Sequence, residues 1–305
     1  MKALVVGYGS IGQRHARLAT DLGCDTAVVS GHANDHPHCY STLDAALNAW
    51  KPAYVVIANQ TSDHYASFAQ LVNLGFTGRV LVEKPLFGEA HPLPATKFSH
   101  AAVAYNFRCH PLVMALASTL AAAKVTAATL HVGQWLPDWR PNRDYRLSYS
   151  AKRGGGGGVL RDLSHELDLA LHLFGPWRSL TATGGKFSDL EIETEDTFSV
   201  SLVAERCPSV DVTMNYLDKP ARRQIAAITD LGRFVLDFLA GTLTKDGVVV
   251  RQEAVERDHT YRAQHQAMLD GTCAKLCTLR EGLDVLELIA AAERANATHA
   301  KVAAA

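Results

Sequence analysis

The first hundred residues alternate between short apolar runs and longer amphipathic stretches. The apolar runs are nearly continuous, which is typical of strands covered on both faces of a parallel sheet. We expect five such strands, at residues 3–6, 26–29, 54–58, 80–82 and 103–105. The stretches between them predict helices at residues 11–22, 43–50 and 63–74. Strands and helices that alternate in this way predict βαβ units and a doubly wound parallel sheet.

The pattern changes after about residue 112. Helical stretches are expected at residues 113–122, 160–174, 260–269 and 279–295. Strands are expected at residues 126–132, 180–184, 197–204, 209–216, 223–229, 233–238 and 247–251. Consecutive strands joined by short turns favour a largely antiparallel open sheet. The sequence therefore predicts an α/β chain of two domains: residues 1–112, and an α+β domain over residues 113–305 for substrate binding and oligomerisation.

Composition narrows the class of protein. A hydrophobic share of 48% suits a globular chain, and 30 basic residues against 31 acidic ones give no reason to expect a nucleic acid or an anionic membrane as partner. No apolar run approaches the ~18 residues of a membrane span, and the first run is too short for a signal peptide. Six scattered cysteines predict reduced thiols, a cytoplasmic setting and no metal site.

The loop after the first expected strand reads GYGSIG and leads into a helix. In that context the pattern G-x-G-x-x-G predicts a dinucleotide-binding Rossmann domain. Gly7 permits the tight turn, Gly9 lets the backbone approach a pyrophosphate, and Gly12 lets the helix pack closely on the strand. Ser10 and Ile11 open that helix, whose N-terminus favours the phosphate charge. We therefore expect a nicotinamide dinucleotide as the cofactor.

The second expected strand ends without an acidic residue. A carboxylate about 20 residues past the glycines would bind the ribose hydroxyls of NAD and repel the 2′-phosphate of NADP. This chain has Ser30 and His32 there instead. Ser30 can donate a hydrogen bond, and His32 or Arg14 can add positive charge, so NADP is favoured over NAD while both stay open. The histidine-rich stretch 32–39 indicates a polar surface loop rather than a metal site.

Two further segments resemble one enzyme family. The stretch LVEKPL, which contains Glu83 and Lys84, is similar to the E-K-P motif of the Gfo/Idh/MocA oxidoreductases, named for glucose–fructose oxidoreductase and inositol dehydrogenase. Residues 156–168 resemble the active-site helix of that family. Weaker similarities cover residues 59–64, 105–108 and 278–283. The resemblance spans nearly the whole chain and implies an NAD(P)-dependent oxidoreductase that forms a homo-dimer or homo-tetramer.

The resemblance also implies roles for single residues. It places Asn59, Thr61, His64 and Glu83 beside the cofactor, Lys84 beside both cofactor and substrate, and Arg108 beside the substrate. It further implies that the bond between Lys84 and Pro85 is cis.

The chemistry of an alcohol dehydrogenase can be argued from the residues. Such a reaction needs a base for the hydroxyl proton while nicotinamide C4 accepts a hydride. Lys84 follows a parallel strand, at the edge where ligands bind, and burial there can lower the pKa of a lysine toward neutrality. His165 lies three residues after Asp162 on the expected helix, so the two share a face, and the carboxylate can fix the histidine tautomer.

One position departs from the family pattern. The family usually places an aspartate four residues before this histidine, where the chain has Arg161. Whether Asp162 takes over its part is left open.

Residues 135–153 form a basic and aromatic stretch before this helix. Arg140, Tyr145 and Arg146 belong to it and can clamp an anionic sugar. A solvated loop or a subunit contact is the alternative. The pattern W-R-P-x-x-D-Y-R, followed by D-L-S-H-E, resembles family members associated with surface-polysaccharide sugars. The five glycines at 154–158 are expected to allow loop movement and close approach of the helix.

We therefore expect hydride transfer to or from a secondary alcohol or ketone of a sugar, sugar acid or nucleotide sugar. Lys84 is the expected acid/base, helped by His165, with Arg108, Arg140, Tyr145 and Arg146 binding the substrate. The alternatives are redox-assisted glycoside cleavage, reduction of a C=N or linear tetrapyrrole substrate, and a non-catalytic NADP-binding regulator. The presence of both Lys84 and His165 argues against the regulator.

Overall fold

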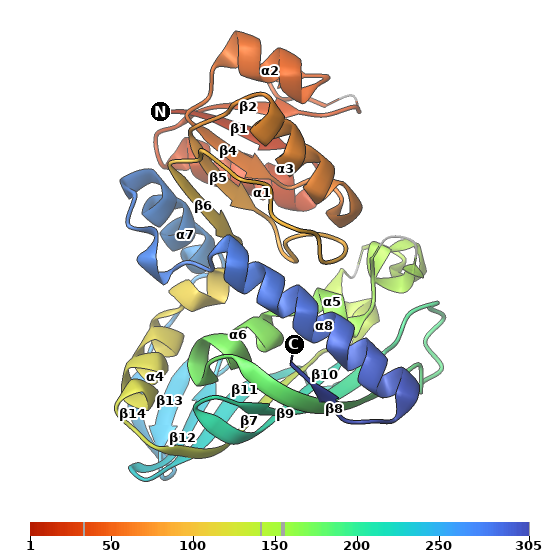
Figure 1. Ribbon diagram of the computed structural model, residues 1–305, viewed down its shortest axis with the longest axis vertical. Coiled ribbons are helices and arrows are strands. Elements are labelled where there is room, and N and C mark those ends of the chain that lie inside the picture. The colour runs from red at the N-terminus through yellow and green to blue at the C-terminus, as the bar shows by residue number, and fades with distance from the viewer. Residues whose placement is uncertain (33, 141, 154–155, 305) are drawn as a thin grey trace. The chain divides into compact units, whose positions relative to one another are not determined.

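The computed structural model describes residues 1–32, 34–140, 142–153 and 156–304 (Figure 1). The chain forms two compact units, one of Met1–Cys109 with Arg257–Leu286, the other of His110–Glu256 with Glu287–Ala305. The stretch 257–286, assigned from the sequence to the second domain, belongs to the first unit. Its residues Met268 and Leu276 are buried in the same core as Val5 and Ala16.

The first unit is built on a parallel sheet. Its strands are β1 (Lys2–Val6), β2 (Asp25–Val29), β3 (Cys39–Tyr40), β4 (Tyr54–Ile57), β5 (Arg79–Val82) and β6 (His100–Val103). Their order is β3-β2-β1-β4-β5-β6, and every neighbouring pair is parallel. The order reverses between β1 and β4, which is the point where dinucleotides bind in doubly wound sheets. The predicted parallel Rossmann sheet is confirmed.

The helices of this unit are α1 (Ser10–Asp21), α2 (Leu43–Trp50), α3 (His64–Asn73) and α7 (His259–Asp270), with the 3₁₀ turns η1 (Thr61–Asp63), η2 (Asn106–Cys109) and η7 (Cys273–Lys275). α1 packs on β1 and β2, and α7 packs on α1. The strand expected at 103–105 lies at His100–Val103, because the chain turns into η2 after Tyr105. α8 (Leu279–Thr298) contributes residues to both units.

The second unit contains a nine-stranded sheet in the order β14-β13-β12-β11-β7-β10-β9-β8-β15. The strands are β7 (Val125–Gly133), β8 (Trp177–Gly185), β9 (Thr197–Ala204), β10 (Cys207–Asn215), β11 (Arg222–Thr229), β12 (Gly232–Asp237), β13 (Thr242–Lys245), β14 (Val248–Gln252) and β15 (Val302–Ala303). β7 and β10 are parallel, and the other neighbours are antiparallel. The predicted α/β fold with a largely antiparallel second sheet is confirmed.

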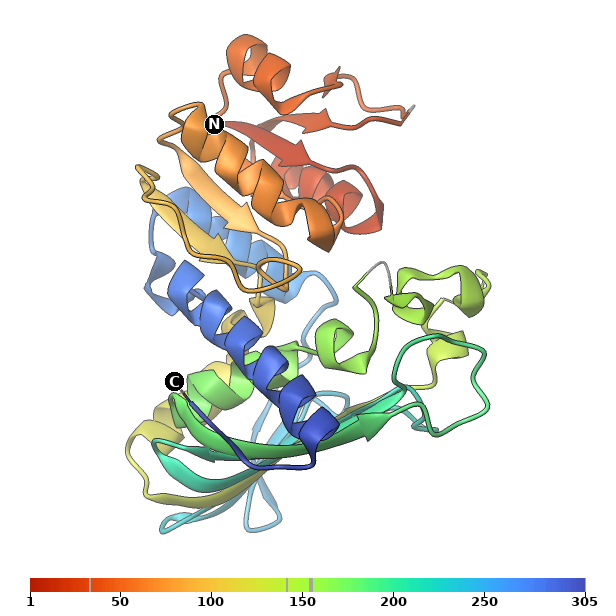
Figure 2. The ribbon, with the colours of Figure 1, turned by 45° about the vertical axis from the view of Figure 1, so that its right-hand side comes forward.

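Helices pack on this second sheet. α4 (Pro111–Ala121), α5 (Val159–Asp162) and α6 (His165–Phe174) contact its strands, and Figure 2 shows α5 and α6 above it. β9 alternates buried and more exposed residues, with Phe198, Val200 and Leu202 facing the core. Such alternation is typical of a sheet with one face packed on a core.

The single helix expected at 160–174 is interrupted. α5 ends at Asp162 and α6 begins at His165, and the bonds from Ser164 to Arg161 and from Glu166 to Leu163 span three residues instead of four. Asp162 and His165 therefore do not share the face of one continuous helix. Before α5 the described residues include the 3₁₀ turns η3 (Leu136–Trp139), η4 (Tyr145–Leu147) and η5 (Tyr149–Ala151).

Two of the five glycines, Gly154 and Gly155, lie outside the described residues, so the expected loop movement there stays a prediction. Gly157 and Gly158 make close contacts. A Cβ on Gly157 would meet the carbonyl oxygen of Tyr149, and one on Gly158 would meet the carboxylate of Glu195. These two glycines therefore let the chain pass close to η5 and to the segment before β9.

Within the described ranges, no helix has the length and apolar character needed to cross a membrane.

Candidate active site

The glycine turn joins β1 to α1. Gly7 has a φ of 95°, and a Cβ on it would lie 2.5 Å from the Cα of Asn59. A Cβ on Gly12 would meet the carbonyl oxygen of Gly7. Both positions are therefore restricted to glycine by the packing of the turn itself.

Gly9 is different, because no described atom lies within 4 Å of the place where its Cβ would be. Gly9 caps α1 without a side-chain bond, and the first turn of α1 holds no acidic residue. The amides of Ser10 and Ile11 are among the first of this helix, which have no partner within it. Open space beside such amides fits a pyrophosphate.

Asn59 follows β4 and packs against Gly7 of the glycine turn. Its Nδ2 donates to Ser67 Oγ at 2.9 Å, while its Oδ1 is buried and has no hydrogen-bond partner among the described residues. A buried acceptor without a partner is costly unless a ligand or water supplies a donor. This atom therefore also fits a bound dinucleotide.

Ser30 and His32, the predicted adenosine-side residues, follow β2. The Ser30 hydroxyl donates to the His32 carbonyl at 3.1 Å and accepts the His32 amide at 3.2 Å. The loop beyond folds back toward the glycine turn, since the rings of His36 and Tyr8 are 5.5 Å apart. Burial, together with the charge of Asp35, raises the pKa of Tyr8. The Asp35 carboxylate of this loop thus lies near Tyr8 in the glycine turn.

Lys84 lies just beyond β5, and its bond to Pro85 is cis. The backbone amide of Lys84 donates to Glu83 Oε2 at 3.0 Å. His64, which begins α3, is buried, with Nδ1 3.1 Å from the Pro85 carbonyl and Nε2 3.3 Å from the Asn59 carbonyl. His64 thus contacts both the loop that follows β4 and the loop that follows β5. Thr61 is the first residue of η1.

A buried chain of hydrogen bonds ends at Glu83. Tyr54 Oη lies 2.9 Å from His265 Nδ1, His265 Nε2 lies 2.8 Å from His15 Nδ1, and His15 Nε2 lies 2.8 Å from Glu83 Oε1. All four side chains are buried in the first unit. Sequence reasoning missed this chain because His15 and His265 are 250 residues apart and neither lies in a recognisable motif.

Three ionisable groups of this chain have shifted pKa values. Burial raises the pKa of Glu83, but the hydrogen bond and charge of His15 and the charge of Lys84 outweigh it, and the pKa is lowered. Burial and the charge of His15 hold the pKa of His265 well below its ordinary value, and burial raises that of Tyr54. Every polar atom of the chain is satisfied when Tyr54 donates to His265, His265 donates to His15, and His15 donates to the Glu83 carboxylate.

The second unit holds His165 and Asp162. Asp162 is buried, and its Oδ2 accepts the Tyr216 hydroxyl at 2.6 Å. The Tyr149 hydroxyl is hydrogen-bonded to Asp162 as well, and burial together with the charge of Asp162 raises the pKa of both tyrosines. Arg161, at the position of the family's usual aspartate, forms an ion pair with Glu293 of α8.

His165 is half-buried at the start of α6. It therefore lies in a different unit from Lys84.

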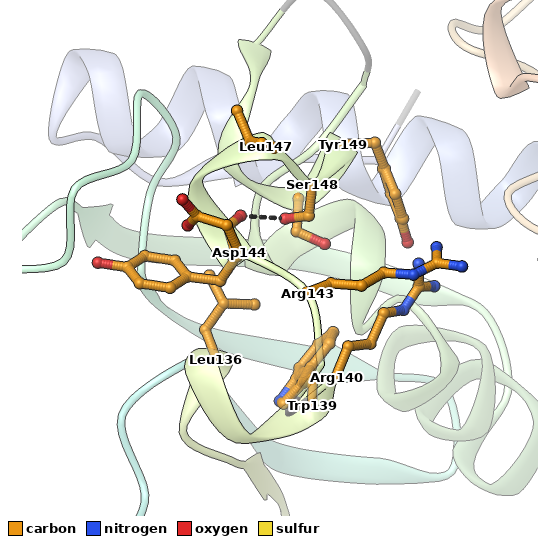
Figure 3. Close-up of a pocket in the computed structure, with 10 residues that line it drawn as sticks. Leu136, Trp139, Arg140, Arg143, Asp144, Leu147, Ser148 and Tyr149 are labelled. Atoms are coloured by element: carbon orange, nitrogen blue, oxygen red, sulfur yellow. Dashed lines mark hydrogen bonds between the residues drawn. The ribbon is translucent and has the colours of Figure 1, made fainter.

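The basic stretch before α5 lines a cavity of about 560 Å³ (Figure 3). Of the predicted substrate residues, Arg140 and Tyr145 line it, whereas Arg146 is not among the lining residues. Arg146 pairs with Asp144 at 2.8 Å and with Glu191 at 2.7 Å. Sequence reasoning did not single out Arg143, which also lines the cavity.

Arg108, the remaining predicted substrate residue, is buried in the first unit and pairs with Glu281 at 2.6 Å. Glu281 and Thr278 bond to each other's backbone amides, which is the capping box of α8. Arg108 therefore ties η2 to the start of α8. No group of three potential metal ligands occurs in the ranges that the structure describes.

Comparisons with known proteins agree with this architecture. An uncharacterized oxidoreductase of Synechocystis is 29% identical over 157 residues, which are 49% of this chain and 42% of that protein. The alignment thus spans about two fifths of that relative's length. The structure of GenD2 from gentamicin A biosynthesis, in complex with NAD, is 24% identical with a TM-score of 0.81, covering 100% of this chain and 96% of that one.

A second solved structure is the WlbA dehydrogenase from Bordetella pertussis, in complex with NADH and UDP-GlcNAcA. It is 18% identical with a TM-score of 0.78, covering 100% of this chain and 98% of that one. Two family models also match. Residues 1–102 match the oxidoreductase family with an NAD-binding Rossmann fold, and residues 113–235 match the GFO/IDH/MocA C-terminal domain. The chain therefore belongs to the Gfo/Idh/MocA oxidoreductases and carries their NAD-binding Rossmann domain.

Proposed function

We propose that the chain catalyses hydride transfer between a nicotinamide cofactor and a secondary alcohol or ketone of a sugar, sugar acid or nucleotide sugar. One observation carries this proposal. A single compact unit combines an open glycine turn after β1 with Lys84 at the carboxyl end of β5. Ligands of doubly wound sheets bind at this edge, so Lys84 lies where a reacting group would be held.

The residues that would hold the dinucleotide come from three loops. The amides of Ser10 and Ile11 would donate to the pyrophosphate above Gly9, Asn59 Oδ1 would accept a hydrogen bond from a hydroxyl or amide group of the dinucleotide, and Ser30 would face the adenosine ribose. When bound, the nicotinamide supplies the hydride donor or acceptor.

Lys84 is the proposed acid/base. In the oxidative direction it takes the hydroxyl proton while the carbinol carbon gives up its hydrogen with two electrons, which leaves a carbonyl. The buried Glu83 carboxylate holds the backbone amide of Lys84, so the chain from Tyr54 is a support for the position of Lys84.

His165 is proposed to bind the substrate hydroxyl or to relay its proton. The part of Asp162 is a separate question, because its carboxylate already binds two tyrosines. Replacing Asp162→Asn tests it. Loss of turnover with an unchanged fold would give the carboxylate a part in the reaction, and full activity would make it structural.

We propose that the protein binds NADP(H) as well as NAD(H). Ser30 leaves the end of β2 without a carboxylate, which removes the usual repulsion of a 2′-phosphate. Asp35 lies near Tyr8 and acts in the opposite direction. We keep the preference for NADP(H) as a proposal.

We also propose a cytoplasmic location and a homo-oligomeric state. The six cysteines are free thiols, which supports a reducing, cytoplasmic environment. The resemblance to the family supports a homo-dimer or homo-tetramer.

The test is incubation of the protein with either cofactor and a panel of sugars, while the absorbance of reduced nicotinamide is followed. Hydride transfer requires that deuterium at the reacting carbon slows the reaction and appears in the cofactor. Dinucleotide binding without turnover on any substrate would favour the regulator. Glycoside cleavage without net change of the cofactor would favour the redox-assisted alternative.

A further inference from the structure

The cavity of about 560 Å³ in the second unit is formed by one stretch of chain. All of its described lining residues fall between Leu136 and Ser150. Sites for small molecules usually measure ~300–1,000 Å³, so this volume holds a monosaccharide with an attached charged group.

Two cations in this cavity lack a compensating acid. Among the described residues, neither Arg140 nor Arg143 forms an ion pair, although both line the cavity. The neighbouring cations are compensated, since Arg146 pairs with Asp144 and Glu191, and Lys152 pairs with Glu193 at 2.9 Å. Asp144, Glu191 and Glu193 thus pair with cations other than Arg140 and Arg143.

The two arginines point the same way. In Figure 3 the guanidinium groups of Arg140 and Arg143 lie together, on the side of the cavity where the Tyr149 hydroxyl lies. Adjacent guanidinium groups repel each other, and a carboxylate or phosphate between them relieves that repulsion while it accepts their paired N–H donors.

The cavity also has an aromatic lining residue, Trp139, which is held by its neighbours. The Trp139 ring meets Tyr216 edge to face at 5.2 Å, and its Nε1 donates to the Gln134 carbonyl at 3.2 Å. Tyr216 in turn donates to Asp162. An indole face held in this way suits the C–H face of a sugar ring.

Hydrogen bonds also hold the part of the lining that follows the arginines, from Tyr145 to Ser150. The Thr194 hydroxyl donates to the Ser150 carbonyl at 2.7 Å, and the Ser148 hydroxyl donates to the Tyr145 carbonyl at 2.6 Å. The cavity is therefore shaped before a ligand arrives, which lowers the entropic cost of binding.

We propose that Arg140 and Arg143 form an oxyanion site that binds the carboxylate or phosphate of an anionic sugar, with Trp139 packing on the sugar ring. The assignment of that sugar as substrate rests on the proposed dehydrogenase function. Tyr149 links the site to Asp162, which ends α5 three residues before His165, so the anion is held in the unit that supplies His165.

Calorimetric titration with D-glucuronate, D-glucose 1-phosphate and D-glucose tests the site. The wild-type protein should bind at least one anionic probe about tenfold or more tightly than glucose, and added salt should weaken that binding. The probe that binds tells a carboxylate site from a phosphate site. Equal affinity for all three probes, or no binding of either anion, would overturn the proposal.

Charge-matched variants locate the site. Arg140→Gln and Arg143→Gln should each weaken anion binding about tenfold, whereas Lys152→Gln removes one positive charge from the same region and should leave it within about twofold. Equal loss in all three variants would reduce the effect to net charge and refute the site.

Turnover separates this proposal from the proposed function. Anion binding that depends on Arg140 and Arg143 without any hydride transfer would retain the site and reject the dehydrogenase. Hydride transfer with the same kcat/KM for acidic and neutral sugars would retain the dehydrogenase and reject the site.

Discussion

Replacing His15→Leu removes the centre of the buried chain that links Tyr54 to Glu83. Leucine has a similar size but offers neither a donor to the carboxylate nor an acceptor for His265 Nε2–H. Loss of a hydrogen bond to a buried charge costs about 1.5–3 kcal/mol, and an orphaned buried donor costs a further ~1–3 kcal/mol. We therefore expect the free energy of unfolding to fall by about 3–5 kcal/mol, as when one partner of a buried charged pair is removed.

Two milder variants calibrate this loss. Tyr54→Phe removes only the terminal hydroxyl and leaves His265 Nδ1 without a donor, which should cost about 1–2 kcal/mol. His15→Gln keeps a donor that can reach Glu83 and should fall between the other two. Urea unfolding followed by circular dichroism gives the three values, with the slope m checked against the wild type because the chain has two units.

The pH dependence of the unfolding free energy should also change direction in His15→Leu, which a loss of packing alone would not cause. In the wild type the pKa of Glu83 is lowered, so its contribution to stability is present above its unfolded pKa and lost as pH falls. Without His15, burial should raise that pKa, so the variant should lose stability as pH rises instead. A His15→Leu protein within about 1 kcal/mol of the wild type, with the same pH profile, would refute this account of the chain.

The cofactor crevice and the buried histidines give three further predictions. Gly9→Ala should leave the fold intact but weaken dinucleotide binding, whereas Gly12→Ala should destabilise the protein in urea, and equal effects on both properties would contradict the geometry of the turn. Ser30→Asp should weaken NADP(H) binding about tenfold in a fluorescence titration and spare NAD(H), and an unchanged ratio of affinities would contradict the place of Ser30 at the ribose. Burial lowers the pKa of His64 and His265 in the native state, so below about pH 6.5 the unfolded state binds more protons than the native state. The free energy of unfolding should therefore fall with pH in that range, by up to ~1.4 kcal/mol per pH unit for each histidine. A flat profile down to about pH 5 would contradict their burial in the neutral form.

The sequence predicted those parts of the fold whose signal is local. The continuous apolar runs of β1, β4 and β5 are wholly or almost wholly buried strands. β3 and β15 are strands of only two residues, too short for any periodic pattern. The break between α5 and α6 could not be predicted, because apolar residues continue at helical spacing through Leu163. The hydrogen bonds donated by Ser164 and Glu166 nevertheless span three residues instead of four.

The candidate site divides in the same way. The glycine turn and the stretch around Lys84 are contiguous motifs, so their residue types and spacing could be interpreted from the sequence. The partners of Glu83 could not, because α7 joins the first unit through tertiary packing on η2 and α1, which are distant from it in the sequence. In the basic stretch, residue type alone could not separate Arg143, which has no described ion pair, from Arg146, which has two.

The most direct test of the central claim is the turnover number of Lys84→Ala on a substrate identified with the wild type, measured beside the affinity for the dinucleotide. Because a general acid–base contributes about 10²–10⁴-fold, kcat should fall by that factor, and an added primary amine should restore part of it. The dinucleotide affinity should stay within about twofold, since the glycine turn holds the phosphates independently. A Lys84→Ala protein that turns over at the wild-type rate would contradict the mechanism.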